Sequence, residues 1–256
     1  MVDPRIHVET LGTEGGSPVV LVHGAPDRST SLTPLVPLLE GHSVTVYDRR
    51  GYGRSLGAGP AGPMSDHADD LLDILEGFDS PPVVVAHSFG SNPALLAAVQ
   101  RPEAFDVLGV WEPPMPWTEY WPEHTKAYLR EIAAAPDPRP TVETMYRQMV
   151  GDSGWEKMAP AVRELVLAES VAFQRDMASE LEAPYDPADV RVPTLVGCGT
   201  ETGGGHIEGA EFLTDALPDA RLLMIEGVGH FCHRTHPRDY AGFIRATVLF
   251  AGERRA

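Results

Sequence analysis

The fold of this chain is constrained most by a regular alternation between short apolar runs and longer amphipathic stretches. Runs rich in β-branched residues occupy residues 18–22, 43–47, 82–86, 107–111, 192–196 and 221–225. Such near-continuous apolar runs are typical of strands in a parallel sheet that is covered on both faces. Helical periodicity fills three of the intervals, at residues 65–78, 92–100 and 208–217. The alternation predicts an α/β fold with a mostly parallel central sheet flanked by helices.

One long region interrupts this alternation. Between the fourth and fifth strand runs no further strand run occurs, and helical periodicity appears at residues 118–135, 141–150, 160–170 and 171–183, separated by proline clusters. A region of this length is too long for a plain crossover connection. We interpret it as an inserted all-helical cap over the carboxyl edge of the sheet. The predicted domains are therefore a core of residues 1–112 and 190–256 and a cap of residues 113–189.

The third strand run leads directly into Ala86-His87-Ser88-Phe89-Gly90-Ser91. This is the strand–turn–helix pattern of a nucleophile elbow, in which the central serine has a strained backbone at a tight turn. Residues two before and two after such a serine must be small, and here they are Ala86 and Gly90. The pattern usually has glycine in the first of these places, and Ala86 departs from it by one methyl group. Ser88 is thus the candidate nucleophile, at the N-terminus of the next helix.

Together with three further motifs, the elbow makes the chain resemble those members of the α/β-hydrolase superfamily that carry a helical cap. The motifs are His23-Gly24 after the first strand run, Asp48 to Ser55 as D-x-R-G-x-G-x-S, and Gly227-Val228-Gly229-His230-Phe231. The resemblance implies that His230 is the general base for Ser88. It also implies an oxyanion hole made by the backbone N–H groups of Phe89 and Ala25.

The third catalytic residue departs from the family pattern. Most of the family has an aspartate after the strand at residues 193–198, but Thr202 stands at that position. Glu112, at the end of the preceding strand run, is the first candidate, since some relatives carry their acid there and the two prolines that follow would stiffen the turn. Glu201 is the second candidate. A dyad without an acid, or Glu208, is a further alternative.

The charge balance limits the partners. The 256 residues include 20 basic and 37 acidic residues, a net charge of −17. Because nucleic acids and anionic membranes attract positive charge, we expect neither as a partner. The sequence has no apolar run of membrane-spanning length and no signal-peptide pattern, and its two cysteines make no disulfide framework. These features predict a cytoplasmic protein. The spacing of His230, His233 and His236 suggests metal ligands, but against the hydrolase pattern we expect no metal and no cofactor.

The hypothesis that follows is a cofactor-free serine hydrolase for a carboxylic ester, thioester or lactone of a small to medium, largely apolar molecule. A C–C bond hydrolase, or a lyase, cyclase or acyltransferase on the same fold, is the alternative. A ligand receptor on a hydrolase scaffold is a third hypothesis, and the presence of both Ser88 and His230 argues against it. The sequence leaves the oligomeric state and the individual substrate open.

Overall fold

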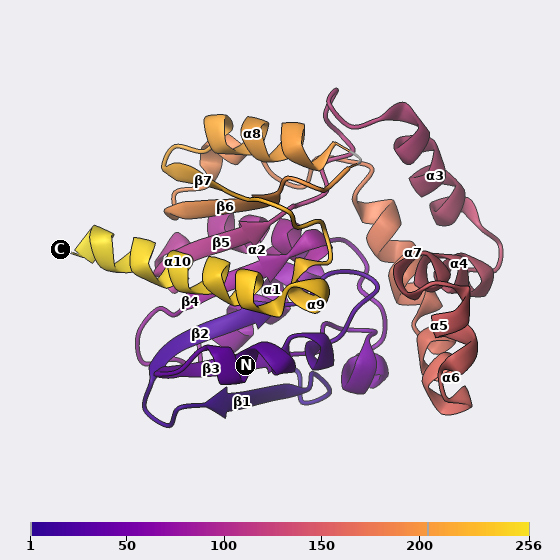
Figure 1. Cartoon of the computed structure of the whole chain (residues 1–256), viewed down its shortest axis with the longest axis horizontal. Coiled ribbons are helices and arrows are strands. Elements are labelled where there is room, and N and C mark those ends of the chain that lie inside the picture. Colours follow the sequence, from indigo (N-terminus) through magenta and orange to yellow (C-terminus); the bar gives the residue numbers. More distant parts are fainter. Residues whose placement is uncertain (1, 204, 256) are drawn as a thin grey trace.

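The computed structural model describes residues 2–203 and 205–255, so residues 1, 204 and 256 of the predicted core lie outside the described residues. A seven-stranded sheet in the order β1-β3-β2-β4-β5-β6-β7 forms the centre (Figure 1). Its strands are β1 Val8–Gly12, β2 Ser17–Val22, β3 His42–Tyr47, β4 Val83–His87, β5 Val107–Trp111, β6 Thr194–Gly199 and β7 Ala220–Ile225. All strand pairs are parallel except β1 with β3. The predicted mostly parallel α/β sheet is confirmed.

Strand β1 is the one strand of the described chain that the sequence patterns did not predict. It pairs with β3 in antiparallel register at the edge of the sheet, with Val8 opposite Tyr47. Its side chains alternate between exposed and half-buried. An edge strand that is wet on one face has no continuous apolar run, so the signal that marks the central strands is missing here.

Helices cover both faces of the sheet, which explains why the strand runs are apolar throughout. On one face Val20, Val84 and Leu108 pack in a buried cluster with α1 (Ser65–Leu75), α2 (Ser91–Gln100) and α8 (His206–Ala216). On the other face Val19 and Val85 pack against α10 (Pro237–Arg255), which α9 (Cys232–Thr235) precedes. Successive strand residues point to opposite faces, so each must be apolar. Short 3₁₀ helices lie in the connections, at Ser29–Ser31, Thr33–Leu38, Gly53–Ala58, Ser88–Gly90, Pro102–Ala104 and Pro187–Asp189.

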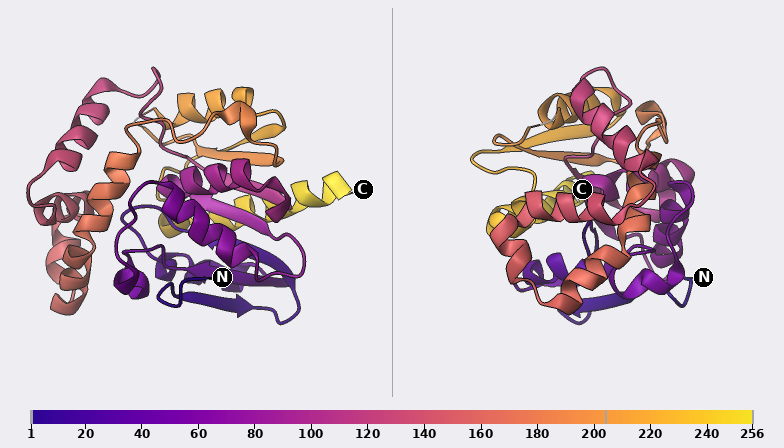
Figure 2. Two further views of the ribbon diagram at one scale, coloured as in Figure 1. Left: turned by 180° about the vertical axis from the view of Figure 1, so that it is seen from behind. Right: turned by 90° about the vertical axis from the view of Figure 1, so that its right-hand side faces the viewer.

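The predicted helical insertion is present between β5 and β6. It contains α3 Glu123–Ala134, α4 Arg139–Val150, α5 Asp152–Lys157, α6 Pro160–Ala168 and α7 Ser170–Ser179. These helices share an apolar cluster of their own, which includes Leu129, Val142, Trp155 and Phe173 and also takes in Phe89 of the core. The insertion lies beyond the ends of the strands, opposite the C-terminus, and in the right-hand view of Figure 2 it faces the viewer. The domain limits at residues 113 and 189 stay a prediction.

None of the helices among the described residues is both long enough and apolar enough to cross a membrane.

Candidate active site

Ser88 lies at the sharp turn between β4 and α2. Its φ of +53° is in the left-handed region, which a residue other than glycine adopts only where the surroundings hold it. The turn is crowded: a Cβ on Gly90 would come within 2.4 Å of the carbonyl oxygen of His23. Ala86 is fully buried on the other side of the turn. Of the two small residues that the elbow pattern requires, Gly90 thus stands where a side chain would clash with the neighbouring backbone.

The structure brings Ser88, His230 and Glu112 together in one hydrogen-bonded line. His230 Nε2 lies 2.8 Å from Ser88 Oγ, and His230 Nδ1 lies 2.7 Å from Glu112 Oε2. The Glu112 side chain is fully buried at the end of β5, where its φ is +46°. Burial raises the pKa of the Glu112 carboxyl, but the hydrogen bond and charge of His230 outweigh burial, so that this pKa lies below its ordinary value. Glu112 is thus an anion in contact with the imidazole.

The loop after β6 supports Glu112 from the other side. Thr202 Oγ1 donates to Glu112 Oε2 over 2.9 Å, and the Gly199 N–H donates to Oε1 over 2.8 Å. Strands β5 and β6 are parallel neighbours, so their carboxyl ends lie side by side. A carboxylate at the end of either strand can therefore reach the same histidine. The threonine at the position of the usual aspartate binds the displaced acid instead of replacing it.

The other two carboxylates considered from the sequence lie elsewhere. Glu201 is exposed, and its backbone N–H donates to the carbonyl of Val228. Glu208 is exposed in the first turn of α8. Of the three acids, Glu112 is the one that lies within hydrogen-bonding distance of His230 Nδ1.

Ala25 and Phe89, the predicted oxyanion donors, belong to two segments that meet at Ser88. Phe89 follows it in the turn, and Ala25 follows Gly24 in the loop after β2. That loop passes directly against the nucleophile, because a Cβ on Gly24 would come within 3.0 Å of Ser88 Cβ. A side chain at this position would crowd Ser88, so glycine suits the close approach. The Ala25–Pro26 peptide bond that follows is cis.

His206 contacts the site and was not predicted. Its ring stacks on that of His230, with centroids 4.4 Å apart and planes 19° apart, and it makes a T-shaped contact with Trp121. Burial and then the charge of His230 lower the pKa of His206 to about 3, so the ring is neutral. Nothing in the sequence distinguishes this histidine from the other nine, because the contact arises only when α8 begins beside the histidine loop.

A second group of side chains holds the histidine loop from behind. His87 Nε2 lies 2.8 Å from the carbonyl oxygen of His230, so His87 packs away from the nucleophile, as its alternation in the strand predicts. The ring centroids of His233 and His87 lie 4.2 Å apart with their planes tilted by 60°, and His233 contacts Asp27, which also binds Arg234. Burial keeps the pKa of His87 well below its ordinary value, so a neutral ring fills this space.

Among the described residues, one group has the spacing of metal ligands: Glu112, His206 and His230 each offer an atom, and these atoms lie within 4.8 Å of one another. Both ring nitrogens of His230 already have partners, namely Ser88 Oγ and Glu112 Oε2. A metal bound here would replace those hydrogen bonds. The contacts fit the transfer of a proton between Ser88 and His230 better than they fit metal ligation.

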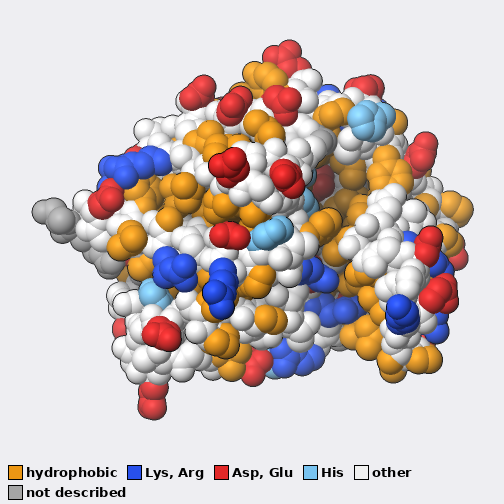
Figure 3. Space-filling model, viewed as in Figure 1, with side chains coloured by type: hydrophobic (Ala, Val, Ile, Leu, Met, Phe, Trp, Pro, Cys, Tyr) orange, Lys and Arg blue, Asp and Glu red, His pale blue; other side chains and the backbone are white. Residues whose placement is uncertain are grey.

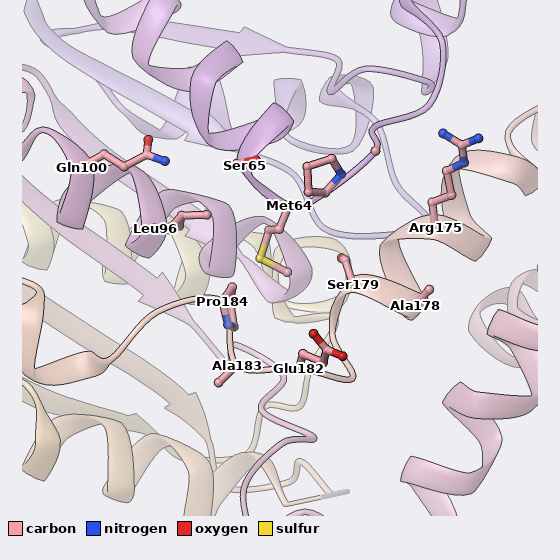
Figure 4. Close-up of a pocket in the computed structure, with 12 residues that line it drawn as sticks. Met64, Ser65, Leu96, Gln100, Arg175, Ala178, Ser179, Glu182, Ala183 and Pro184 are labelled. Carbon is pink, nitrogen blue, oxygen red and sulfur yellow. The ribbon is translucent and has the colours of Figure 1, made fainter.

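The surface near the site and a separate cavity can both be followed in the figures. Figure 3 shows a hollow between the core and the insertion, with acidic side chains gathered over α8. A cavity of about 700 Å³ lies elsewhere, between α1, α2 and α7 (Figure 4). Met64, Leu96, Arg175 and Glu182 line it, and neither Ser88 nor His230 does. This cavity is not the place where a substrate would meet the nucleophile.

Comparison with known proteins identifies the family of this chain. A family model described as "Alpha/beta hydrolase family" matches residues 19–243. Methylesterase 9 of Arabidopsis thaliana is 39% identical over 93 residues, which are 34% of this chain and 36% of the relative. The matched part thus spans about a third of that curated relative.

Two solved structures illustrate the similarity of the fold. A thermophilic esterase from Thermogutta terrifontis superimposes with a TM-score of 0.72 at 23% identity, over 96% of this chain and 93% of that one. An enol-lactonase from Burkholderia xenovorans LB400 superimposes with a TM-score of 0.74 at 14% identity, over 95% and 96% of the two chains. At these identities the similarity shows the fold alone.

Proposed function

The chain belongs to the alpha/beta hydrolase family, and from this premise we propose that it is a serine hydrolase of carboxylic esters, thioesters or lactones. The observation that carries the proposal is the hydrogen-bonded line from Ser88 through His230 to Glu112. A nucleophile, a base within hydrogen-bonding distance and a third group that orients the base are the arrangement that acyl transfer requires.

In the proposed reaction Ser88 Oγ attacks the acyl carbon while His230 Nε2 accepts its proton. The bond to the leaving group then breaks, and His230 returns the proton to the leaving oxygen or sulfur. Water attacks the acyl-enzyme in the same way and releases the acid and free Ser88. Glu112 accepts the Nδ1–H of His230, which fixes the tautomer that leaves Nε2 free to act as a base, and its negative charge stabilises the imidazolium.

The negative oxygen of each tetrahedral intermediate is assigned to the backbone N–H groups of Ala25 and Phe89. One such donor contributes ~3 kcal/mol of transition-state stabilisation. The close approach of Gly24 to Ser88 supports the assignment, since it brings the loop after β2 beside the attacking oxygen.

The proposed substrate is a small or medium molecule with a largely apolar acyl or alkyl group. The support is the apolar cluster of the insertion, which includes Phe89, the residue after the nucleophile. The net charge of −17 disfavours polyanionic substrates. Two of the structurally similar proteins, the esterase and the enol-lactonase, are named for reactions of the proposed kind.

The proposal is tested with a fluorophosphonate probe and a series of p-nitrophenyl esters from acetate to octanoate. We expect the probe to label Ser88 and the wild-type protein to release p-nitrophenol. Glu112→Gln should lower kcat by roughly 10³- to 10⁴-fold. Glu201→Gln is the matched control, because it removes the charge of the other candidate acid, and it should change kcat less than about twofold.

The outcomes separate the alternatives. Failure of the probe to label Ser88 would contradict serine catalysis altogether. Labelling of Ser88 without hydrolysis of any ester would favour C–C bond cleavage or a lyase, cyclase or acyltransferase reaction. Loss of activity in Glu201→Gln but not in Glu112→Gln would transfer the role of the acid to Glu201.

A further inference from the structure

A fully buried arginine lies beside the oxyanion loop, and the proposed mechanism gives it no role. Arg49 follows β3 in the turn that begins at Asp48, and its side chain is completely inaccessible to solvent. Its Nε donates to the carbonyl oxygen of His23 over 3.1 Å, and its Nη2 donates to that of Gly24 over 2.9 Å. A buried guanidinium must have its charge balanced and its donors used, so this placement is specific.

The Gly24 carbonyl belongs to the peptide group whose N–H is that of Ala25. His23 also binds this carbonyl: the Arg49 backbone N–H donates to His23 Nε2 over 2.9 Å, so Nδ1 carries the proton that it donates to Gly24 O over 2.8 Å. In a trans peptide the C=O and N–H point in opposite directions. Two donors at the oxygen therefore fix the direction of the Ala25 N–H, away from Arg49.

The positive charge at this carbonyl has a second effect. Hydrogen bonds polarise one another when they are joined through a peptide group, because electron density moves from the nitrogen towards the oxygen. An N–H whose carbonyl binds a guanidinium is a stronger donor. The Arg49 side chain is buried, so little solvent screens this effect.

The insertion holds Arg49 in place. Asp176 of α7 is buried, and its Oδ2 accepts from Arg49 Nη1 and Nη2 at 3.0 and 2.9 Å and from the Tyr52 hydroxyl at 2.8 Å. The other oxygen, Oδ1, lies 2.9 Å from His67 Nε2 of α1. The aromatic rings of Tyr52 and Phe89 lie against the guanidinium at 4.8 and 4.5 Å. Arg49 has little freedom to adopt another position.

A second carboxylate of the insertion reaches the same loop. Glu169, at the junction of α6 and α7, accepts two hydrogen bonds from Arg28 at 2.6 and 2.7 Å and a third from the Gly53 N–H at 2.7 Å. Arg28 lies three residues after Ala25. The loop after β2 is thus held by the insertion on both sides of Pro26. Before Pro26, Gly24 is linked to Asp176 through Arg49, and after Pro26, Arg28 binds Glu169 directly.

We propose that Arg49 is a positioning residue for the reaction: held by Asp176 of α7, it orients and polarises the Gly24–Ala25 peptide, so that the Ala25 N–H binds the oxyanion. The helical insertion then takes part in acyl transfer, in addition to any contact with the substrate. This inference rests on the proposed serine hydrolase function and adds to it a residue that touches neither the substrate nor Ser88.

The test replaces the buried pair as a unit, because an unpaired buried charge would destabilise the fold. The double variant Arg49→Met/Asp176→Leu retains the volume and removes both charges, and Arg49→Lys retains the charge but not the geometry. We expect kcat on a p-nitrophenyl ester to fall roughly 10- to 100-fold in both variants, with KM changed less than about threefold.

A transition-state analogue supplies a readout that a structural role would not move. Ser88 Oγ adds to the carbonyl carbon of an aryl trifluoromethyl ketone, its proton passes to His230, and the former carbonyl oxygen becomes the oxyanion. The inhibition constant should rise by the same factor by which kcat falls.

The chain offers a matched control one residue along. Arg50 donates two hydrogen bonds to Asp70, at 2.6 and 2.5 Å. Its side chain extends from the same turn in another direction and makes no hydrogen bond to His23 or Gly24. Arg50→Met/Asp70→Leu should leave kcat and the inhibition constant within about threefold of the wild-type values.

Each outcome bears on one proposal. Wild-type labelling of Ser88 by the fluorophosphonate tests the proposed function, and its failure would overturn that function first. If the wild type is labelled and the folded Arg49 variants keep their kcat and inhibition constant, the positioning role is wrong and the serine hydrolase proposal stands. Equal losses in the Arg49 and Arg50 variants would also overturn the positioning role, because they would indicate a general effect on the fold.

Discussion

The two halves of the helical insertion differ in how their charged side chains are used. In α4 and its neighbours the ion pairs are exposed: Arg147 contacts three carboxylates, each at least one third exposed to solvent. In α7 and at its start, Asp176 and Glu169 are almost fully buried and bind residues of the core. Exposed pairs contribute little to stability, whereas breaking a buried pair is costly. The contribution of an ion pair to stability therefore depends less on its position along the insertion than on whether its helix packs against the core.

The largest effect is expected from breaking the buried contact between Asp176 and Arg49. Asp176→Ala should lower the free energy of unfolding by about 3–5 kcal/mol, because the Arg49 guanidinium would stay buried without its partner. Urea denaturation followed by circular dichroism measures the change. A loss below about 1 kcal/mol would mean that α7 is no more integral to the core than α4 is.

A second prediction concerns the pH dependence of stability that arises from two buried histidines. Burial lowers the pKa of His23 to about 4 and that of His206 to about 3, against an ordinary value near 6.5 in the unfolded chain. Unfolding therefore takes up protons below pH 6.5, so the stability present above pH 6.5 is lost as the pH falls towards 4. Each group contributes up to about 1.4 kcal/mol per pH unit.

Denaturation at pH 7.5, 6 and 5 measures this loss. His206→Phe keeps a flat ring against His230 and should reduce the slope. An unchanged free energy of unfolding between pH 6.5 and 5 would show that these rings are not held neutral in the folded protein.

A third prediction has the opposite sign. Glu180 follows α7 and is buried, with one carboxyl oxygen lacking a hydrogen-bond partner among the described residues. Burial and then the charge of Asp176 hold the pKa of Glu180 well above its ordinary value. The folded state keeps this proton while the unfolded state releases it, so the stability due to Glu180 is lost as the pH rises above its unfolded pKa.

Glu180→Gln removes that loss without changing the shape of the side chain. At pH 8 we expect the melting temperature to rise by about 2–4 °C, equivalent to about 1 kcal/mol for a chain of this length. At pH 4 the gain should disappear, since the carboxyl is then largely protonated in both states. Destabilisation at pH 8 would indicate that Glu180 is ionised.

The smallest effect is expected in the outer half of the insertion. Arg147→Ala removes contacts to Glu143, Asp152 and Glu156, all on the surface. The melting temperature should stay within about 2 °C of the wild-type value, measured by calorimetry at 0.15 M salt. A larger change would contradict the distinction between the two halves.

Much of the fold was predictable because the signals are local. Six strands were predicted from apolar runs, since each residue of a strand covered on both faces must itself be apolar. The turn at Ser88 was predictable because its steric demands fall on residues two positions away. The edge strand β1 was not, because half of its side chains meet water.

The candidate site was predictable in part for the same reason. Glu112 was the first choice as the acid because it ends a strand and precedes two prolines, and it lies 2.7 Å from His230 Nδ1. The supporting roles of Thr202 and His206 had no sequence signal. Thr202 binds Glu112 across 90 residues of chain, and only the pairing of β5 with β6 brings them together.

The sequence alone determined the α/β architecture, the elbow at Ser88 and the candidate base His230, because local patterns of polarity and residue size carry that information. Tertiary structure alone decided which acid meets His230, which ring stacks on it, and that Asp176 of the insertion binds Arg49 beside Gly24. These contacts join segments up to 127 residues apart. A pair of buried charges can be recognised only in the folded structure, since either residue by itself looks like part of the solvated surface.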